Sequence, residues 1–526
     1  MRSLVRVVSS SESAARDAAA IAGGVPSRAL MQRAGAAAAA EIALRYRDRI
    51  GGEILILAGP GNNGGDAWVV ARALDTAGAR IRVVEPVPCK APDALAEREL
   101  AMQQLSARCV ETAMPADSLY RGEALIIDGL LGTGAKGPPS GALGTIIEQL
   151  SSLSTRDAAI VALDVPSGLD ATTGDTAGAI APADLTLSFG TIKRGQLVNR
   201  EVCGGIVVLD IGLGGHASLG DGAPQLVDEP WVASQVPRIP ASAHKGVRKK
   251  LAIVGGSVGM VGATILAARS AIRSGIGMVK LIVDDDSLRA VQESEPYALA
   301  AAWPGDDAGV GHAITDWADA VVIGPGLGRT DASRALLDRV LRRWTGPIVL
   351  DADALTLFEG EAAKLGQHLR GRQAIITPHP VEFARLSGAP VDSVLLRRFE
   401  IGRELAATLG ACVLLKGVPT VVTSPNGKRL VSASGNQALA TAGSGDVLSG
   451  ITGTMLAQIG DAFTAGAVSA WVHGHAAERV PGSGDTGTRG IALEDIINEL
   501  RDVWTFSERP LRYPILHELS NVGARR

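Results

Sequence analysis

The feature that most constrains the fold is a repeated pairing of a short apolar run with a polar loop that contains glycine or proline. In the first half of the chain these runs fall at 54–58, 81–85, 125–128, 160–164 and 206–210. A helical stretch is expected after the first of them, from about Ala67 to Ala77. Continuous apolar strands that alternate with helices are typical of a parallel sheet buried on both faces. The pattern therefore predicts an α/β fold with a doubly wound sheet.

The same rhythm begins again after a stretch of different composition. Between Gly214 and about His244 the residues Gly, Ser, Ala and Pro cluster, which is typical of a linker or domain junction. A helical block follows Thr441, and the tail after about Ser507 is interpreted as accessory. Apolar runs recur between the linker and that block, at 251–254, 279–283, 320–324, 347–351, 374–377 and 412–416. For a chain of 526 residues we therefore predict two α/β domains, at 1–220 and 230–510.

Composition excludes several classes of protein. Lys and Arg together number 51 against 55 for Asp and Glu, a formal charge of −4, so neither nucleic acid nor an anionic membrane is an expected partner. The four cysteines form no close C-x-x-C pair, which argues against a zinc site, a redox dithiol or a disulfide scaffold. No signal-peptide core and no uncharged apolar stretch of about 18 residues is present. A cytoplasmic homo-oligomer that acts on small molecules is the expectation.

Three polar loops follow strands in the first half. The glycines of Gly59–Asp66 would let backbone N–H groups point at a phosphate from a helix N-terminus, although the loop has neither the Walker A nor the usual GxGxxG order. Asp128 and Asp164 end two further strands, and ligands bind beyond the carboxyl ends of parallel strands. Asp128, the Asn63 amide oxygen and the Ser167 hydroxyl could hold a cation, and Asp164 could be a general acid or base. The alternative is that these aspartates cap helices or brace turns.

The motifs PGNNGGD, DGLLGTG and DVPSGLD, preceded by VPSRALMQRAG at 25–35, resemble the N-terminal epimerase domain of the bifunctional NAD(P)H-hydrate repair enzymes. The resemblance covers nearly all of 1–215, departs at Ala67 where Gly is usual, and implies a Rossmann-like three-layer sandwich. It implies a potassium ion among Asn63, Asp128 and Ser167, and a catalytic contact of Asp164 with the hydrated nicotinamide. It also implies that the hydrated dinucleotide is held by Asn62, Asn63, Gly64, Gly65, Asp66, Gly132, Thr133, Gly134, Ala135, Lys136, Gly137, Pro138 and Asp164.

The most informative stretch of the second half is TAGSGD at 441–446. Gly443, Ser444 and Gly445 can form an anion-binding nest at the start of a helix, with Asp446 just inside it. A carboxylate in that place can deprotonate an acceptor hydroxyl beside a transferring phosphoryl group. The alternative is an ordinary glycine-rich helix start with Asp as a first-turn charge. Lys416, in a KGVPT loop after a strand, could meet phosphate oxygens.

Other loops of the second half carry polar or glycine residues at strand ends. GPGLG at 324–328 could let a ligand lie close to backbone, and Asp351 and Asp353 end the next strand. His379 precedes a helix, where a lone histidine is more often structural than catalytic.

In chain order, HKG, GGSVGM, GPGLG, TPHP, KGVPT and GNQALATAGSGD resemble the ADP-dependent NAD(P)H-hydrate dehydratases of the ribokinase-like superfamily, over about 240–505. The chain departs from the family pattern at Lys249, Val381, Pro419 and 437–439. The resemblance implies Asp446 as the base, ADP as co-substrate and Mg²⁺ as the metal. It implies contacts with the hydrated cofactor at Ala263, Gly326, Gly328, His379 and Asp446. It implies ADP binding by Lys416, Gly417, Val418, Pro419, Thr420, Asn436, Gln437, Ala438, Leu439, Ala440, Thr441, Ala442, Gly443, Ser444 and Gly445.

Together the two resemblances imply a repair function for damaged coenzyme. The first domain would interconvert the R and S forms of hydrated NADH and NADPH, and the second would dehydrate the S form while ADP becomes AMP and phosphate. Two alternatives stay open. One is a small-molecule kinase, such as one acting on a hydroxymethylpyrimidine, fused to a ligand-binding domain. In the other, the first domain is a non-enzymatic binding or assembly module, since fold alone does not settle function.

Overall fold

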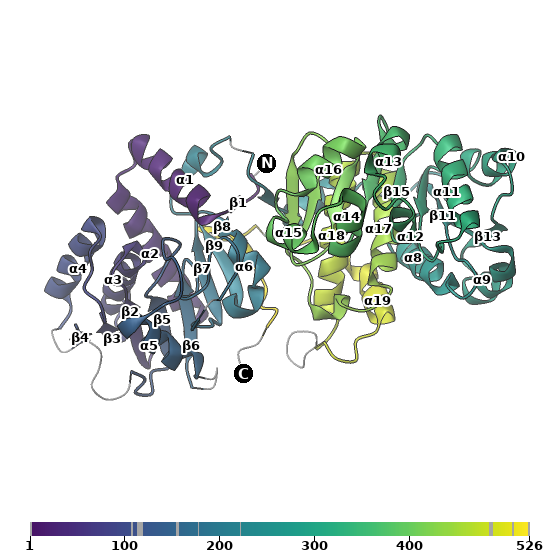
Figure 1. The fold of residues 1–526 in the computed structure, drawn as a ribbon. Coiled ribbons are helices and arrows are strands. Elements are labelled where there is room, and N and C mark those ends of the chain that lie inside the picture. The colour runs from purple at the N-terminus through teal and green to yellow at the C-terminus, as the bar shows by residue number, and fades with distance from the viewer. Residues whose placement is uncertain are drawn as a thin grey trace. The chain divides into compact units, whose positions relative to one another are not determined.

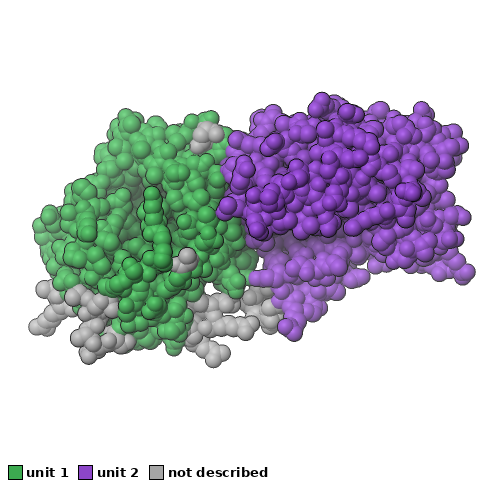
Figure 2. Space-filling view, in the orientation of Figure 1, with its two compact units in different colours: residues 1–223, 509–526 green, residues 224–508 purple. Residues whose placement is uncertain are grey.

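The computed structural model describes residues 3–106, 109–112, 119–153, 157–176, 178–220, 222–482, 488–507 and 510–523. The chain forms two compact units, one of residues 1–223 with 509–526 and one of residues 224–508 (Figure 2). Each unit is an α/β structure with its own sheet, and the predicted fold class is confirmed. Among the helices of the described ranges, none combines the length and apolarity needed to cross a bilayer.

An eight-stranded sheet forms the centre of unit 1 (Figure 1). Seven of its strands are parallel, and β20 at one edge runs antiparallel to its neighbour β9. In spatial order the strands are β20 (Ile515–Leu519), β9 (Gly205–Leu209), β7 (Leu185–Phe189), β6 (Ala159–Leu163), β5 (Leu125–Gly129), β2 (Glu53–Ala58), β3 (Arg80–Val84) and β4 (Val110–Glu111).

Helices cover both faces of this sheet, because successive side chains of a strand point to opposite faces. Ile54 and Ile56 of β2 pack in the core that contains α2 (Ser27–Arg45) and α3 (Asn62–Thr76). Leu55 and Leu57 of the same strand pack in a second core with α5 (Gly141–Ser151). The sheet and the helices on its two faces therefore form a three-layer sandwich. The remaining helices of this unit are α1 (Ser10–Ala22), α4 (Pro92–Gln104) and α6 (Arg194–Val198), and a two-stranded sheet pairs β1 (Val7–Val8) with β8 (Ile192–Lys193).

The C-terminal tail belongs to unit 1 rather than forming an appendage of unit 2. Its strand β20 pairs with β9 through Ile515 and Leu519, and Arg512 donates a hydrogen bond to the buried Glu41 carboxylate of α2. The sequence led us to interpret the tail as accessory, and strand β20 was not predicted.

A ten-stranded sheet forms the centre of unit 2 (Figure 1). It is parallel except for the antiparallel pairs that β18 makes with β17 and β19. In spatial order the strands are β10 (Gln225–Leu226), β19 (Arg429–Ser432), β18 (Thr420–Thr423), β17 (Cys412–Leu415), β16 (Ala374–Ile376), β15 (Ile348–Leu350), β14 (Ala320–Ile323), β11 (Lys250–Val254), β12 (Met278–Val283) and β13 (Leu299–Ala302).

Two groups of helices flank this sheet. One core joins strand residues to α11 (Asp331–Arg343), α13 (Ala362–Leu369), α14 (Pro380–Ser387) and α16 (Gly402–Leu409). The other group comprises α8 (Val261–Arg273), α17 (Ser444–Ile459), α18 (Ala462–Arg479) and α19 (Leu493–Val503), which contact one another. The short helices are α7 (Glu229–Gln235), α9 (Leu288–Ser294), α10 (Asp307–Val310), α12 (Asp353–Thr356) and α15 (Val391–Leu396).

The close approach of α17 to α8 depends on a glycine. A Cβ added at Gly450 would lie 2.0 Å from the Ala267 carbonyl oxygen of α8. The small residue lets α17 pack deep against its neighbour, and this fixes where the first turn of α17 presents Asp446.

Candidate functional site

A cavity of about 510 Å³ lies at the carboxyl ends of the strands of unit 1. Such a volume suits a small-molecule site. Helix faces build part of its wall: Ser13, Asp17 and Ile21 recur at helical spacing on α1, and residues of α2 do the same. The sequence-predicted residues that line this cavity are Asn62, Asn63, Asp66, Gly132, Thr133, Gly134, Ala135 and Asp164.

Other predicted residues of this unit do not line the cavity. A Cβ at Gly64 would lie 1.9 Å from the Gly59 carbonyl oxygen, and one at Gly65 would lie 2.5 Å from the Met31 sulfur. These two glycines therefore allow α3 to pack closely against the strand end and α2. Lys136, Gly137 and Pro138 are exposed and lie outside the cavity wall.

Helix α3 begins at Asn62, so the predicted start near Ala67 is wrong. Glycine is a poor helix former, but tertiary packing overrides that preference here. Gly61 is the N-cap and makes no side-chain cap bond, so the first N–H groups of α3 have no intrahelical partner. The motif thus forms a helix N-terminus at the cavity wall, a place suited to an anion.

The three predicted cation ligands converge on one short segment, 130–131. Asp128 is buried and accepts hydrogen bonds from the Ser167 hydroxyl at 2.6 Å, the Ser167 N–H at 2.8 Å and the Leu130 N–H at 3.2 Å. The Asn63 side-chain nitrogen donates to the Leu131 carbonyl at 2.8 Å. Within the described residues, the buried Asn63 Oδ1 accepts no hydrogen bond. Burial raises the pKa of Asp128, and the hydrogen bonds from Ser167 oppose that rise.

Asp164 is held in place by a buried lysine that sequence reasoning missed. Its backbone lies in the left-handed region, with φ of 63°, directly after β6. Lys193, 1% exposed, donates to Asp164 Oδ1, and the Phe189 N–H donates to the same oxygen at 3.1 Å. The Gln196 side chain donates to the Asp164 carbonyl at 2.7 Å. The carboxylate is thus rigidly presented to the cavity. Its lysine partner lies 29 residues away, beyond the reach of a local motif.

Two more carboxyl groups face the same space. Burial, with the nearby Asp164 and Asp17 carboxylates, raises the pKa of Asp66 well above its usual range. Burial also raises the pKa of Asp17 to about 6, a rise that Lys193 opposes. Desolvation and like charges both favour the protonated form of an acid. The cavity therefore combines a salt-bridged carboxylate with two carboxyl groups whose surroundings favour the protonated form more than water does.

In unit 2 the corresponding place is the N-terminus of α17. Gly443, with φ of 93°, is its N-cap, and Asp446 lies in the first turn. Burial and the neighbouring Asp351 carboxylate raise the pKa of Asp446 to about 7, while Lys416 opposes that rise. The Ser444 hydroxyl lies 3.3 Å from Nε2 of His473, and burial lowers the pKa of this histidine to about 4. Asp446 can therefore exchange a proton near neutral pH beside backbone donors.

Lys416 lies beside this turn in a network of buried charges. Its Nζ is 2.9 Å from Asp351 Oδ1 and 3.7 Å from Glu382 Oε2. Burial disfavours the ammonium, but the Asp351 and Glu382 carboxylates raise the pKa of Lys416 overall. Ser449 of α17 donates to the other Asp351 oxygen at 2.6 Å. A Cβ at Gly445 would lie 3.3 Å from Lys416 Nζ, so the ammonium borders the glycine-rich turn. Sequence reasoning marked Asp351 only as a strand end.

His379 has a structural role in this unit. It is the N-cap of α14, and its Nδ1 accepts from the N–H groups of Val381 at 3.2 Å and Glu382 at 3.4 Å. Burial lowers the pKa of His379, which suits an accepting, neutral ring. The ring is about half exposed beside the Lys416 network, so it remains available to a ligand.

The remaining predicted contacts lie on neighbouring turns. Ala263 lies in the first turn of α8, and its N–H donates a hydrogen bond to the Met260 carbonyl oxygen. A Cβ added at Gly326 would lie 2.3 Å from that same oxygen, so the two turns are in close contact. The Gly328 N–H donates to Asp353 Oδ2 at 2.9 Å. The predicted nucleotide-binding loops are partly exposed to solvent. The exposed residues are Gly417, Val418, Gln437, Ala440, Thr441 and Ala442, and the half-buried ones are Thr420, Asn436, Leu439, Gly443 and Gly445. The buried ones are Pro419, Ala438 and Ser444.

Two family profiles match the chain in the order that the two units have. The profile "YjeF-related protein N-terminus" matches residues 27–195, and "NAD(P)H-hydrate dehydratase" matches residues 251–500. A bifunctional NAD(P)H-hydrate repair enzyme of Leishmania infantum is 34% identical over 525 residues, covering 92% of this chain and 91% of its own length. The enzyme of the same description from Escherichia coli K12 is 33% identical, with coverages of 90% and 89%.

Among solved structures, an ADP/ATP-dependent NAD(P)H-hydrate dehydratase from Bacillus subtilis, co-crystallised with ATP and Mg²⁺, is 28% identical with a TM-score of 0.45. It covers 53% of this chain and 96% of its own. Full-length relatedness in sequence, rather than this structural likeness, decides the assignment. The chain belongs to the family of bifunctional NAD(P)H-hydrate repair enzymes.

Proposed function

We propose that this protein repairs hydrated NADH and NADPH. Unit 1 interconverts the R and S epimers at C6 of the hydrated nicotinamide ring, and unit 2 dehydrates the S epimer with ADP as co-substrate. The observation that carries the proposal is the position of Asp446, in the first turn of α17 beside Lys416 and the Gly443–Gly445 turn. That arrangement provides a base next to donors for phosphoryl oxygens.

The chemistry requires a better leaving group than hydroxide. Transfer of the β-phosphoryl group of ADP to the C6 hydroxyl oxygen forms a C6–O–P ester and releases AMP. The C6–O bond then breaks with its electron pair on phosphate, while the N1 lone pair forms a double bond to C6. Loss of a proton from C5 places the double bond between C5 and C6. The products are the reduced coenzyme, AMP and phosphate, and no oxidant or reductant is consumed.

The residues of unit 2 divide this work. Asp446, whose pKa is raised by burial to about 7, would take the proton of the C6 hydroxyl as it attacks phosphorus. The backbone N–H groups of Gly443–Gly445 would stabilise charge on the transferring group, as in an oxyanion hole. Lys416, held by Asp351, would neutralise phosphate oxygens.

Mg²⁺ is the metal expected with the nucleotide, and it would supply positive charge that offsets the charge of the phosphate groups. Among the described residues, no group of three His, Cys, Asp or Glu side chains is placed to hold a metal. The donor set therefore fits an ion that arrives with nucleotide phosphates rather than one caged by protein. Glu382 of α14 and Asp353 of α12, whose carboxylates lie near Asp446, could contact its hydration shell.

In unit 1, Asp164 is the group proposed to act at the hydrated ring, since it lines the cavity and is fixed by Lys193. Potassium is the proposed resident ion. Asn63 Oδ1, Asp128 and Ser167 supply hard oxygen atoms, and the unpaired buried Asn63 oxygen is the feature that a cation would satisfy. The ion would supply positive charge near the loop at 130–135.

The test uses purified full-length protein and separated R and S hydrates of NADH. With ADP, both epimers are expected to yield NADH; without nucleotide, R and S should interconvert but no NADH should form. Asp446→Asn should abolish dehydration and leave epimerisation intact, while Asp392→Asn, an exposed position on α15, serves as the matched control.

The same assay separates the alternatives. Parallel reactions with ADP and ATP decide which nucleotide serves. A stable phosphorylated product that never yields NADH would favour a small-molecule kinase. Failure of the parent protein to speed the conversion of R into S would favour a binding module for unit 1.

A further inference from the structure

The cavity of unit 1 contains an acidic group from the N-terminal helix that none of the motifs includes. Asp17 lies on the face of α1 that lines the cavity, one turn from both Ser13 and Ile21. Among the described residues, its carboxyl group makes no hydrogen bond or ion pair that would fix it as a structural element. Asp17 is thus available to a ligand that enters the cavity.

Asp66 is a further acidic group on the wall of this cavity. Its side chain is 8% exposed, lines the cavity and accepts no hydrogen bond from the described residues. Burial and the nearby Asp17 and Asp164 carboxylates disfavour the ionised form of Asp66, and a hydrogen-bond donor in the cavity would offset that cost. The occupant of the cavity is the natural donor, and Asp17 faces the same space.

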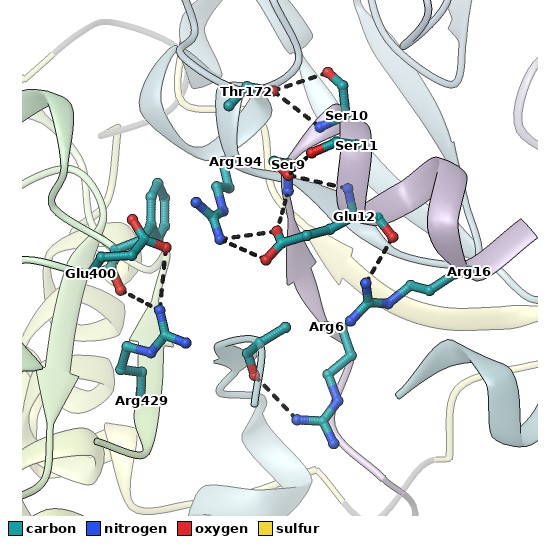
Figure 3. A network of polar contacts seen from close by, with 12 residues as sticks. Arg6, Ser9, Ser10, Ser11, Glu12, Arg16, Thr172, Arg194, Glu400 and Arg429 are labelled. Atoms are coloured by element: carbon teal, nitrogen blue, oxygen red, sulfur yellow. Dashed lines mark hydrogen bonds and ion pairs between the residues drawn. The ribbon is translucent and has the colours of Figure 1, made fainter. Parts of the chain in front are cut away.

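The position of α1 is fixed by a polar network (Figure 3). Ser9 and Glu12 form a capping box, and Ser10 bonds the Thr172 hydroxyl through its N–H at 3.0 Å. Arg194 donates to Glu12 at 2.9 Å, one residue along the chain from the Lys193 that holds Asp164. The neighbouring side chains of Arg194 and Lys193 therefore connect α1, through Glu12, to the end of β6, through Asp164. Asp17, five residues beyond Glu12, is thereby held over the cavity that Asp164 faces.

The charges that face Asp17 come from several elements. Lys193 and Asp164 lie at the end of β8 and after β6, and Asp66 lies on α3. On α1 itself, Glu12 is engaged by Arg194 and Arg16 donates to the Ala217 carbonyl. Two further ionisable groups lie around the helix and cavity, namely His216 beside Gly23 at the end of α1 and Asp93, which accepts from Ser27 at 2.5 Å.

We propose that Asp17 is the second acid–base catalyst of the epimerase site, acting as the partner of Asp164. This inference rests on the proposed function of unit 1. Protonated Asp17 gives its proton to the C6 hydroxyl, and the C6–O bond breaks with its electron pair on oxygen, so that water leaves. The N1 lone pair forms a double bond to C6. A second water adds to the opposite face of C6, that double bond returns to N1 as a lone pair, and Asp164 takes the proton from the added water.

The proton balance explains why both aspartates are needed. One proton leaves Asp17 and one arrives at Asp164, while the composition of the substrate is unchanged. The reverse reaction starts from the state that the forward reaction leaves, with Asp164 as acid and Asp17 as base. Forward and reverse epimerisation therefore require the same total protonation of the pair. The raised pKa of Asp17, caused first by burial, agrees with a group that carries the proton at the start.

The test measures conversion of pure R hydrate into S without nucleotide, after subtraction of the rate without enzyme. Asp17→Asn is expected to lower kcat by about 100-fold or more, with KM changed by less than about 3-fold. Asp17→Glu, which keeps the acid, should retain part of the rate. In the parent protein, kcat/KM should fall above a pH of about 6, where the Asp17–Asp164 pair loses its proton. In Asp17→Glu the pH at which kcat/KM begins to fall, the upper limb of the pH profile, should be different.

Controls keep this inference separate from the proposed function. Asp48→Asn removes an exposed acid of the same unit and should leave the rate unchanged. Urea unfolding of the Asp17 variants reports on folding of unit 1, and dehydration of S hydrate reports on folding of unit 2. If the parent protein fails to epimerise, the proposed function of unit 1 is wrong. If the parent epimerises and Asp17→Asn keeps its rate and pH profile, the role of Asp17 alone is overturned. Should Asp17→Asn fail to fold, an unmoved pH limb in Asp17→Glu would overturn that role.

Discussion

Lys416 forms a buried ion pair with Asp351, with 2.9 Å between Nζ and Oδ1, and Ser449 donates to the second oxygen of the same carboxylate. The pair joins the end of β17 to the end of β15, while Ser449 belongs to α17, the helix that carries Asp446. One carboxylate therefore aligns the proposed phosphate-binding ammonium with the proposed base.

Replacement of Asp351 by Asn should damage both stability and nucleotide binding. The Lys416 ammonium would remain largely buried without its main counter-charge, and breaking such a pair costs about 3 kcal/mol. Urea unfolding should show that loss, and KM for ADP should rise by about 10-fold or more. The exposed Asp392→Asn change should alter neither quantity. A variant with parental KM would show that Lys416 does not need this carboxylate.

Asp446 should give the dehydration reaction a characteristic pH profile. Because burial raises its pKa to about 7, the base form is populated only above that pH. The value of kcat/KM for S hydrate should therefore rise with pH and level off above about 7. A rate independent of pH between 5 and 8, at saturating nucleotide, would contradict the assignment of Asp446 as base.

The same shift predicts how Asp446 affects stability. Its folded pKa lies above the unfolded value of 3.8, so the folded state loses stability as pH rises from about 4 through about 7. Asp446→Asn should match the parent protein below pH 4 and exceed it above pH 7, by about 1–3 kcal/mol. Denaturant titrations at both pH values measure this difference. Equal stabilities of the parent protein and Asp446→Asn at pH 8 would show that ionised Asp446 does not destabilise the folded state.

Removal of the Lys193 charge should affect unit 1 alone. In Lys193→Met the Asp164 carboxylate keeps the Phe189 N–H but loses its cation, so epimerisation should fall by about 10-fold or more. Dehydration of S hydrate by the same preparation should remain at the parental rate. If R-to-S conversion is unaffected, the ion pair is structural only.

Potassium should stabilise the protein through Asn63. KCl should raise the midpoint of thermal unfolding by about 2–4 °C over choline chloride at equal ionic strength. Asn63→Leu removes the buried oxygen that has no partner among the described residues, and it should abolish that difference. A potassium effect of the same size in the variant would place the ion elsewhere.

The strands and the strand-end loops were predictable because a buried parallel strand is a nearly continuous apolar run. Leu55–Leu57 and Val413–Leu415 needed no tertiary information. Asp128, Asp164 and Lys416 follow such runs directly, so their places at one edge of each sheet could be inferred.

The residues that complete each site were not predictable in the same way. Lys193 meets Asp164 only because β8 returns to the end of β6, and Asp17 reaches the cavity only through the docking of α1. Asp17 recurs with Ser13 and Ile21 at helical spacing, which marks a helix face but not what that face covers. The tail strand β20 was missed because pairing with β9 depends on a partner some 300 residues earlier.

The product balance of S hydrate with ADP tests the proposed repair reaction most directly. NADH, AMP and phosphate would be followed together in the full-length protein, with Asp446→Asn alongside. The parent protein is expected to form one of each product per turnover, and the variant is expected to form none. NADH formed without phosphate release, or formed at the parental rate by Asp446→Asn, would contradict it.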